Sequence, residues 1–212
     1  MKNPYKICPF FENENWRLRF VSEADAPELL RVYSDEKAVP LFNSDNCHGD
    51  DFHYTTMEQM KKAIAFWNFS YKEKFFIRWT VLKREPVKIS SRTEHTCQAA
   101  LPASSDCMSG ATAVGTIELF HRDADDYFTD CGILRLDLRS DFEQKETIFE
   151  VLSLIVPSAF ALFDCRMIAT KAPRFADERI EALRKLGFSA TEESLIGGED
   201  GKAYTDYYVL KR

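Results

Sequence analysis

The stretch that decides the fold is IEALRKLGF, residues 180–188. Ile180, Leu183 and Leu186 are spaced three residues apart, which places them on one face of an α-helix. Gly187 follows the last apolar residue, where glycine commonly ends a helix because it adopts a left-handed conformation without strain. We therefore predict a last helix that packs one apolar stripe against the protein and stops at Gly187.

A longer and more apolar helix precedes it. Apolar residues recur at helical spacing from Ile148 to Phe163, and Pro157 predicts a kink within this helix. The segment is shorter than the roughly 20 residues of a membrane-spanning helix and contains Glu150, so we predict no membrane span. Residues 166–170 lie between the two helices and have the apolar character of a central strand.

The first third of the chain predicts a strand and two helices. Residues 16–21 predict a strand, and Ser22 with Asp25 resembles a capping box that opens a helix, with Pro27 in its first turn. A second capping box, Thr55 with Glu58, is expected to open the next helix, in which apolar residues recur at helical spacing up to Tyr71.

Further strands follow from alternation with a period of two. Residues 75–82 place Phe75, Ile77, Trp79 and Val81 on one side. The remaining strands are expected at residues 113–120, 131–138, 189–192 and 204–211. Between two of them the pattern is lost, which predicts a long loop insertion at about residues 83–111. The order of elements predicts a single α/β domain over residues 1–212.

Composition excludes several classes of function. The net charge is −6 with scattered Lys and Arg, so no nucleic-acid partner is expected. Residues 1–11 lack the apolar core of a signal peptide, and the six cysteines form no CxxC pair, so we expect reduced thiols and a cytoplasmic location. A loop holding Asp45, Cys47, His48, Asp50, Asp51 and His53 has the residue types of a metal site. It lacks a recognised ligand spacing, so no metal is predicted.

Three stretches together resemble the GNAT superfamily of N-acetyltransferases. They are LRFVSEADAPELLRVYSD (residues 18–35), AVGTIELF (113–120) and IEALRKLGF (180–188). The chain is most similar to the branch that acetylates the N-termini of ribosomal proteins (RimJ/RimL-like). The resemblance implies a central mixed β-sheet with helices on both faces. It also implies acetyl transfer from acetyl-CoA to a primary amine, either a peptide N-terminus or a small molecule.

The resemblance also implies where acetyl-CoA binds. In this superfamily the pyrophosphate rests on backbone N–H groups of a glycine-containing turn that opens the central helix. The aligned stretch here is residues 142–147, and Gln144 and Glu146 stand where glycines are expected. The residues that the resemblance implies for cofactor binding are Leu136, Leu138, Gln144, Lys145, Glu146, Thr147 and Arg179.

Two of these residues have alternative interpretations. Glu146 would compete with a phosphate for the helix N-terminus, or it is an ordinary acidic residue that favours the helix dipole. Arg179 stands near a position where the superfamily contacts the cofactor, and it either reaches a phosphate or is a solvated helix residue. The altered turn therefore leaves open a second function, a non-catalytic binding module of the same fold that has lost coenzyme A binding.

Two residues are candidates for catalysis. Glu118 lies on the strand face opposite Ile117 and Leu119, and it is either the general base that deprotonates the amine or an outward or salt-bridged glutamate. Tyr204 is the candidate acid for the leaving thiolate, or a packing aromatic. Proteins of this superfamily often pair, so a homodimer is also left open.

Overall fold

The computed structural model describes residues 3–42, 51–85, 110–197 and 201–212. Its strands are β1 (Phe11–Glu12), β2 (Trp16–Phe20), β3 (Ile77–Arg84), β4 (Ala111–Arg122), β5 (Cys131–Leu138), β6 (Met167–Lys171), β7 (Ser189–Ala190), β8 (Leu195–Ile196), β9 (Ala203–Tyr204) and β10 (Tyr207–Lys211). The α-helices are α1 (Ala26–Tyr33), α2 (Val39–Phe42), α3 (Met57–Lys72), α4 (Lys145–Phe163) and α5 (Asp177–Lys185), and 3₁₀ turns cover Glu23–Asp25 and Ser140–Phe142.

Eight strands form one mixed sheet in the order β1-β2-β3-β4-β5-β6-β10-β7. All neighbouring strands pair antiparallel except β5 and β6, which run parallel. The parallel ladder extends only from the pair Cys131–Met167 to the pair Leu134–Thr170. Beyond Leu134, β5 has no strand partner on its β6 side among the residues that the structure describes. The sheet is therefore split there.

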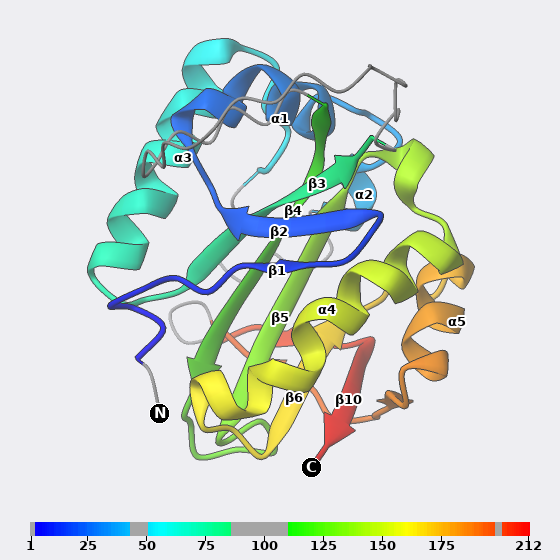
Figure 1. Cartoon of the computed structure of the whole chain (residues 1–212). Helices are drawn as coiled ribbons and strands as arrows, with labels where there is room; N and C mark the ends of the chain where they lie inside the picture. The colour runs from blue at the N-terminus through cyan, green and yellow to red at the C-terminus, as the bar shows by residue number, and fades with distance from the viewer. Residues whose placement is uncertain (1–2, 43–50, 86–109, 198–200) are drawn as a thin grey trace, which may run out of the picture.

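Helices cover both faces of the sheet, and period-two alternation decides what each face presents. On one face Ile77, Trp79 and Val81 join the core beneath α4, and α5 packs beside α4. On the other face α1 and α3 bury Leu29, Trp67 and their neighbours. Figure 1 shows α4 crossing in front of β5 and β6, with α1 and α3 grouped together away from it. The mixed sheet with helices on both faces confirms the expected fold class.

The central strand AVGTIELF needs its glycine for close packing. A Cβ atom at Gly115 would lie 2.2 Å from the carbonyl oxygen of Asp137 on the neighbouring strand. Real Cβ atoms do not approach backbone so closely, so any side chain there would push β4 and β5 apart. Gly115 thus permits the register that places Thr116 opposite Asp137 and Glu118 opposite Arg135.

The predicted starts and ends of helices mostly agree with the structure. The capping box of Ser22 and Asp25 is present, although it caps a 3₁₀ turn that leads into α1. Gly187 has φ +91° directly after the last helix, as predicted. The second capping box is one residue later than expected, because Thr56 and Gln59 exchange the hydrogen bonds instead of Thr55 and Glu58.

Some boundaries were wrong. Phe75 does not belong to the strand, which begins at Ile77 after the left-handed Lys74, and its ring is exposed. The predicted loop insertion at 83–111 is shorter at both ends, since β3 runs to Arg84 and β4 begins at Ala111. Residues 86–109 lie outside the described residues. The last predicted strand is divided into β9 and β10, and β9 pairs with β8 in a separate two-stranded sheet.

Helix α4 is the one described helix whose length and composition would suffice to cross a membrane. A core helix of a globular protein passes the same test. Here Ile148, Val151, Leu152 and Ile155 are buried against the sheet.

Candidate functional site

The split in the sheet leads to the N-termini of two helices. Past Leu134, β5 continues to Leu138 and then through a 3₁₀ turn to Lys145, the first residue of α4. Past Thr170, β6 ends at Lys171, and the chain reaches Asp177, the first residue of α5. A helix N-terminus presents unpaired N–H donors and the positive end of the helix dipole. An anionic group at the wide end of the split would therefore meet these donors.

The first donor of α4 is already occupied. The backbone N–H of Lys145 donates to Oε2 of Glu178, a residue of the first turn of α5, at 2.8 Å. Gln144 is the N-cap residue and gives no side-chain cap. The N–H groups of Glu146 and Thr147 make no hydrogen bond among the described residues. The turn thus keeps two open donors and loses one to a carboxylate of the same chain.

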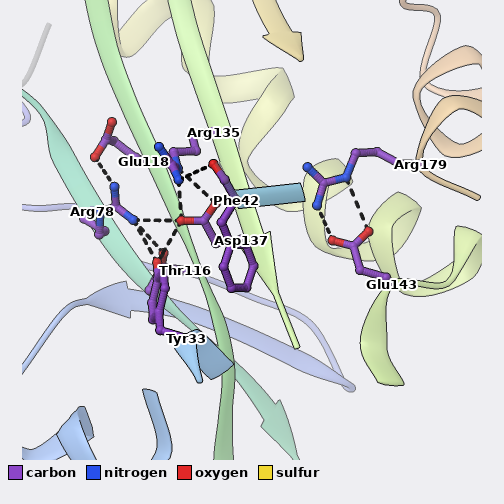
Figure 2. A network of polar contacts seen from close by, with 9 residues as sticks. All are labelled: Tyr33, Phe42, Arg78, Thr116, Glu118, Arg135, Asp137, Glu143 and Arg179. Carbon is purple, nitrogen blue, oxygen red and sulfur yellow. Dashed lines mark hydrogen bonds and ion pairs between the residues drawn. The ribbon is translucent and has the colours of Figure 1, made fainter. Parts of the chain in front are cut away.

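A second contact joins the same two segments. Arg179 forms an ion pair with Glu143, with its Nε 3.3 Å from Oε2 of Glu143. Arg179 is only 5% exposed, so it is neither solvated nor free to reach a phosphate, contrary to both interpretations of the sequence. Nearby, the Lys145 ammonium lies 3.0 Å from Glu181, and this hydrogen bond raises the pKa of Lys145. Side chains of α5 therefore bridge the wide end of the split, where Figure 2 shows the pair of Arg179 with Glu143.

Glu146 does not fold back over the helix N-terminus. Its side chain is 72% exposed, with the carboxylate 3.9 Å from the Lys145 ammonium. This position fits the interpretation of Glu146 as an acidic residue of the first turn. The carboxylate that takes a donor from α4 comes instead from Glu178, 33 residues away from Lys145. Sequence spacing alone gave no sign of that contact.

Leu136 and Leu138 lie on β5 beyond the last residue that pairs with β6. Both side chains are buried in the core beneath α4. Any contact with a cofactor must therefore come from their backbone, whose N–H and C=O groups are strong hydrogen-bonding groups. The structure brings these two residues and the first turn of α4 to the same side of the split.

On the opposite face of β3, β4 and β5 lies a buried polar network, shown in Figure 2. Arg78, Glu118 and Arg135 are cross-strand neighbours, as are Thr116 and Asp137. Arg78 pairs with Glu118 and, at 3.1 Å, with Asp137. Because Arg78 and Asp137 are each about 1% exposed, these two charges are shielded from water and must be satisfied within the cluster.

The remaining members of the network hold these charges in place. Arg135 donates through Nε to Asp137 at 2.9 Å and through its guanidinium to the carbonyl oxygen of Phe42 at 2.7 Å. The hydroxyl of Tyr33 donates to Asp137 at 2.8 Å. Burial would raise the pKa of Asp137, but attraction to Arg135 and Arg78 outweighs it, so this pKa is lowered. Burial also raises the pKa of Tyr33 well above its ordinary value, so the hydroxyl keeps its proton.

A cavity of about 840 Å³ opens above this network. Its walls come from α3, residues 51–54, residues 75–76 and the strands β3, β4 and β5, and seven of the sixteen lining residues are Phe, Tyr or Trp. Arg78, Glu118 and Arg135 are among its polar lining residues, together with Asp51, His53, Gln59 and Lys62. Arg78 holds one carboxylate oxygen of Glu118, and Figure 2 shows the other oxygen directed away from Arg78. Ile133 and Arg135 line the cavity on either side of Leu134, so the cavity reaches the point where the sheet splits.

Glu118 is therefore placed as expected, on the face opposite Ile117 and Leu119. It is salt-bridged to Arg78, which was one of the two alternatives, and it also lines the cavity. Its role as a general base stays a prediction. Tyr204 lies on β9, partly buried against a small core cluster that includes Tyr207. The ammonium of Lys171 lies 5.4 Å from its ring. Its role as an acid stays a prediction.

Other candidates contribute less. Asp51 and His53 line the cavity, whereas Asp45, Cys47, His48 and Asp50 lie outside the described residues. Cys131 is a free thiol, and its burial raises its pKa to about 12, which suits a packing residue better than a nucleophile.

Sequence reasoning missed Arg78, Arg135, Asp137 and Glu178. A signal was present for the first three, because a charged residue interrupts an otherwise apolar strand in IRWTVL and in GILRLDL. Such residues are buried only when they are paired, which indicates a network. Glu178 looked like any acidic residue in a first helical turn, and only the fold brings it to Lys145.

No protein-family model matches the sequence, and no curated protein sequence matches it. Solved structures are similar to this chain in fold. An acetyltransferase of the GNAT family from Bacillus anthracis superposes with a TM-score of 0.60 at 12% identity, over 96% of this chain and 98% of that one. An acetyltransferase from Salmonella typhimurium that modifies the N-terminal serine of a 50S ribosomal protein gives 0.59 at 13%, over 96% and 99%. A ribosomal-protein α-N-acetyltransferase in complex with coenzyme A gives 0.58 at 14%, over 94% and 95%.

Proposed function

We propose that this chain, which has the fold of the GNAT acetyltransferases, transfers an acetyl group from acetyl-CoA to a primary amine, in the cytoplasm. The observation that carries the proposal is the meeting of three features at one place. The cavity ends where β5 and β6 separate, and Glu118 lines it with one carboxylate oxygen directed away from Arg78. The similar solved structures that are acetyltransferases support the same reaction.

The proposed step forms a C–N bond and breaks a C–S bond. The amine nitrogen attacks the thioester carbonyl carbon, and Glu118 accepts the proton that the nitrogen loses. The thiolate of coenzyme A then leaves and takes up a proton, for which Tyr204 stays the candidate donor. Arg78 keeps the Glu118 side chain in position through its ion pair.

The residues around the split fit part of acetyl-CoA. The free edge of β5 at Leu136 and Leu138 offers backbone groups to an extended chain that carries amides. The open N–H groups of Glu146 and Thr147 and the ammonium of Lys145 suit a phosphate. The carboxylate of Glu178 opposes phosphate binding, because it accepts the hydrogen bond from the N–H of Lys145 and brings a negative charge. We propose that the pyrophosphate displaces Glu178 from this donor.

The same contact favours a second candidate. If Glu178 and the buried pair of Arg179 with Glu143 hold the split closed, the chain is a binding module that has lost coenzyme A binding. Such a module would still have the cavity on the other face of the sheet. Coenzyme A binding therefore separates the two candidates.

Titration of the protein with acetyl-CoA tests the choice. At a concentration about 100 times the dissociation constant, the ligand stabilises the protein by roughly 2.7 kcal/mol, which a melting curve resolves. We expect this stabilisation, and acetylated amine in an assay by mass spectrometry. No thermal shift at millimolar acetyl-CoA would reject the acetyltransferase and favour the module.

Replacing Glu118 by glutamine tests its role. The amide side chain would keep an oxygen for Arg78 but could not accept a proton. We expect kcat of E118Q to fall by about 10²- to 10⁴-fold with acetyl-CoA affinity changed by less than about threefold. The matched control is E150Q, since Glu150 accepts a hydrogen bond from Trp16 on the α4 face of the sheet. Full activity of E118Q would show that another group removes the proton.

A further inference from the structure

The residues that line the cavity on the α1 and α3 face indicate which kind of amine is the acceptor, which the reaction type alone does not. Its volume, about 840 Å³, lies within the range of small-molecule sites. Trp67, Phe66, Phe75, Phe76 and Phe120 all line it. Seven of the sixteen lining residues are Phe, Tyr or Trp, so the cavity offers a large aromatic surface beside its polar side chains.

The guanidinium groups of the network stack over two of the aromatic rings that line the cavity. Arg78 stacks over Trp67 with its Cζ 4.3 Å from a ring centroid, and Arg135 stacks over Phe52 at 3.7 Å. Those two ring faces are therefore filled by the protein itself. The cavity keeps Phe66, Phe75 and Phe120 as aromatic surface for a ligand.

Two exposed aromatic rings, those of Phe66 and Phe75, line the cavity together with the polar side chains of Gln59 and Lys62. Phe66 is 56% exposed and Phe75 is 60% exposed, although both are large hydrophobic side chains. Phe66 lies 6.2 Å from Phe76 between ring centroids, so the exposed rings continue inward as an aromatic wall. Exposed aromatic residues that continue into a cavity are typical of a binding site for an apolar group.

The inner end of the cavity has a different chemistry. Glu118 is nearly buried, and both Arg78 and Arg135 lie beside it. A carboxylate can bind an amine. The two guanidinium groups nearby disfavour the protonated form of that amine, so they favour the neutral amine, which is the nucleophile. A carboxylate on the ligand would be repelled by Glu118. The cavity therefore combines exposed aromatic rings with a carboxylate that can bind an amine.

We propose that the acceptor is a primary amine joined to an aromatic ring by a short aliphatic chain, with the ring at Phe66 and Phe75 and the nitrogen at Glu118. This inference rests on the proposed function, because it identifies the acceptor of the same site. A free arylalkylamine and a peptide whose first residue is phenylalanine share this chemistry. The experiment distinguishes the two sources.

Isothermal titration measures binding of the amine alone, without acetyl-CoA. The probes are phenethylamine, 2-cyclohexylethylamine, ethanolamine and the tripeptide amides Phe-Ala-Ala and Ser-Ala-Ala. Phenethylamine should bind about two- to tenfold more tightly than its saturated analogue, from ring–ring contacts. Its affinity should exceed that of ethanolamine by on the order of tenfold or more, because its ring buries apolar surface. Stronger binding of Phe-Ala-Ala than of phenethylamine would identify a peptide as the source, and the reverse a free amine.

Two variants locate the ring. F75A and F66A each remove an exposed aromatic side chain, so both are expected to fold, and each should weaken phenethylamine binding by about threefold or more. The matched control is F10A, whose ring is also exposed and does not line the cavity. It should bind as the unaltered protein does.

Equal affinity for all amines, or unchanged binding in both F75A and F66A, would overturn the inference. Its failure is distinguishable from failure of the proposed function. Selective amine binding without acetyl transfer would keep the site for an aromatic amine and reject the acetyltransferase. Acetyl transfer to amines without aromatic preference would keep the enzyme and reject the inference.

Discussion

At the scale of single residues, charge burial is the dominant constraint on this protein. Arg78 and Asp137 are shielded from water and would each be costly to bury alone, so the network tolerates little change. The sequence signalled these residues only as charges inside apolar strands. It could not indicate which charges pair, because pairing depends on the cross-strand register of β3, β4 and β5.

Asp137 predicts how stability depends on pH. In the unfolded chain an aspartate titrates near pH 4, while in the fold the pKa of Asp137 is lower. The unfolded chain therefore binds its proton first on acidification. The stabilisation is fully present above about pH 4 and is lost as the pH falls through the folded pKa. Urea unfolding between about pH 7 and pH 3 should show the free energy of unfolding decrease in this window.

The variant D137N tests the assignment. It should lower the free energy of unfolding at pH 7 by about 3 kcal/mol, because it leaves buried guanidinium groups without their counter-charge, and should weaken the acid dependence. The control is D141N at the exposed pair with Arg139, for which a change under about 1 kcal/mol is expected. An acid dependence in D137N as steep as in the unaltered protein would contradict the role of Asp137.

At the scale of elements, the contact between α4 and α5 decides how accessible the split is. The apolar stripe of Ile180 and Leu183 was predicted from helical spacing, and the structure shows that it packs α5 beside α4. That packing brings Glu178 to Lys145 and Arg179 to Glu143. The sequence could not predict these two contacts, since they join residues far apart in the chain through tertiary packing.

Removing the carboxylate of Glu178 should open a donor for phosphate. In E178A the backbone N–H of Lys145 loses its partner and one negative charge disappears from the helix N-terminus. We expect affinity for coenzyme A to rise about three- to tenfold, the worth of one hydrogen bond. The measurement is isothermal titration with free coenzyme A.

The matched control is E181Q. Glu181 belongs to the same helix but binds the side chain of Lys145 rather than its backbone. Its replacement should change coenzyme A affinity by less than about twofold, as expected for an exposed pair. Equal affinities of E178A and the unaltered protein would mean that Glu178 does not compete with the phosphate.

At the scale of the whole molecule, the order of strands and helices followed from the sequence because period and capping are local properties. The fold class was predictable for this reason. The short β1, α2 and β8 were missed, since two to four residues give too few repeats to define a period. The cavity was also not predictable, because α3, residues 51–54 and three strands build it together.

We also expect the chain to unfold as one domain. Trp16 and Trp79 belong to the core under α4, and Trp67 belongs to the core of α1 and α3. If both cores melt together, tryptophan fluorescence of W67F and far-ultraviolet circular dichroism should give the same midpoint in urea. Two separated midpoints would show that the two faces of the sheet unfold independently.

The free edge of β5 lies within the sheet rather than at its rim. An open strand edge at a rim is a template on which other chains pair and aggregate. Here β6 and the two helix N-termini flank the edge, so a neighbouring β-strand with its side chains has no route to it. The protein thereby keeps an unused hydrogen-bonding edge that admits only a thin, flexible molecule, without the risk of association that the same edge would bring at the rim.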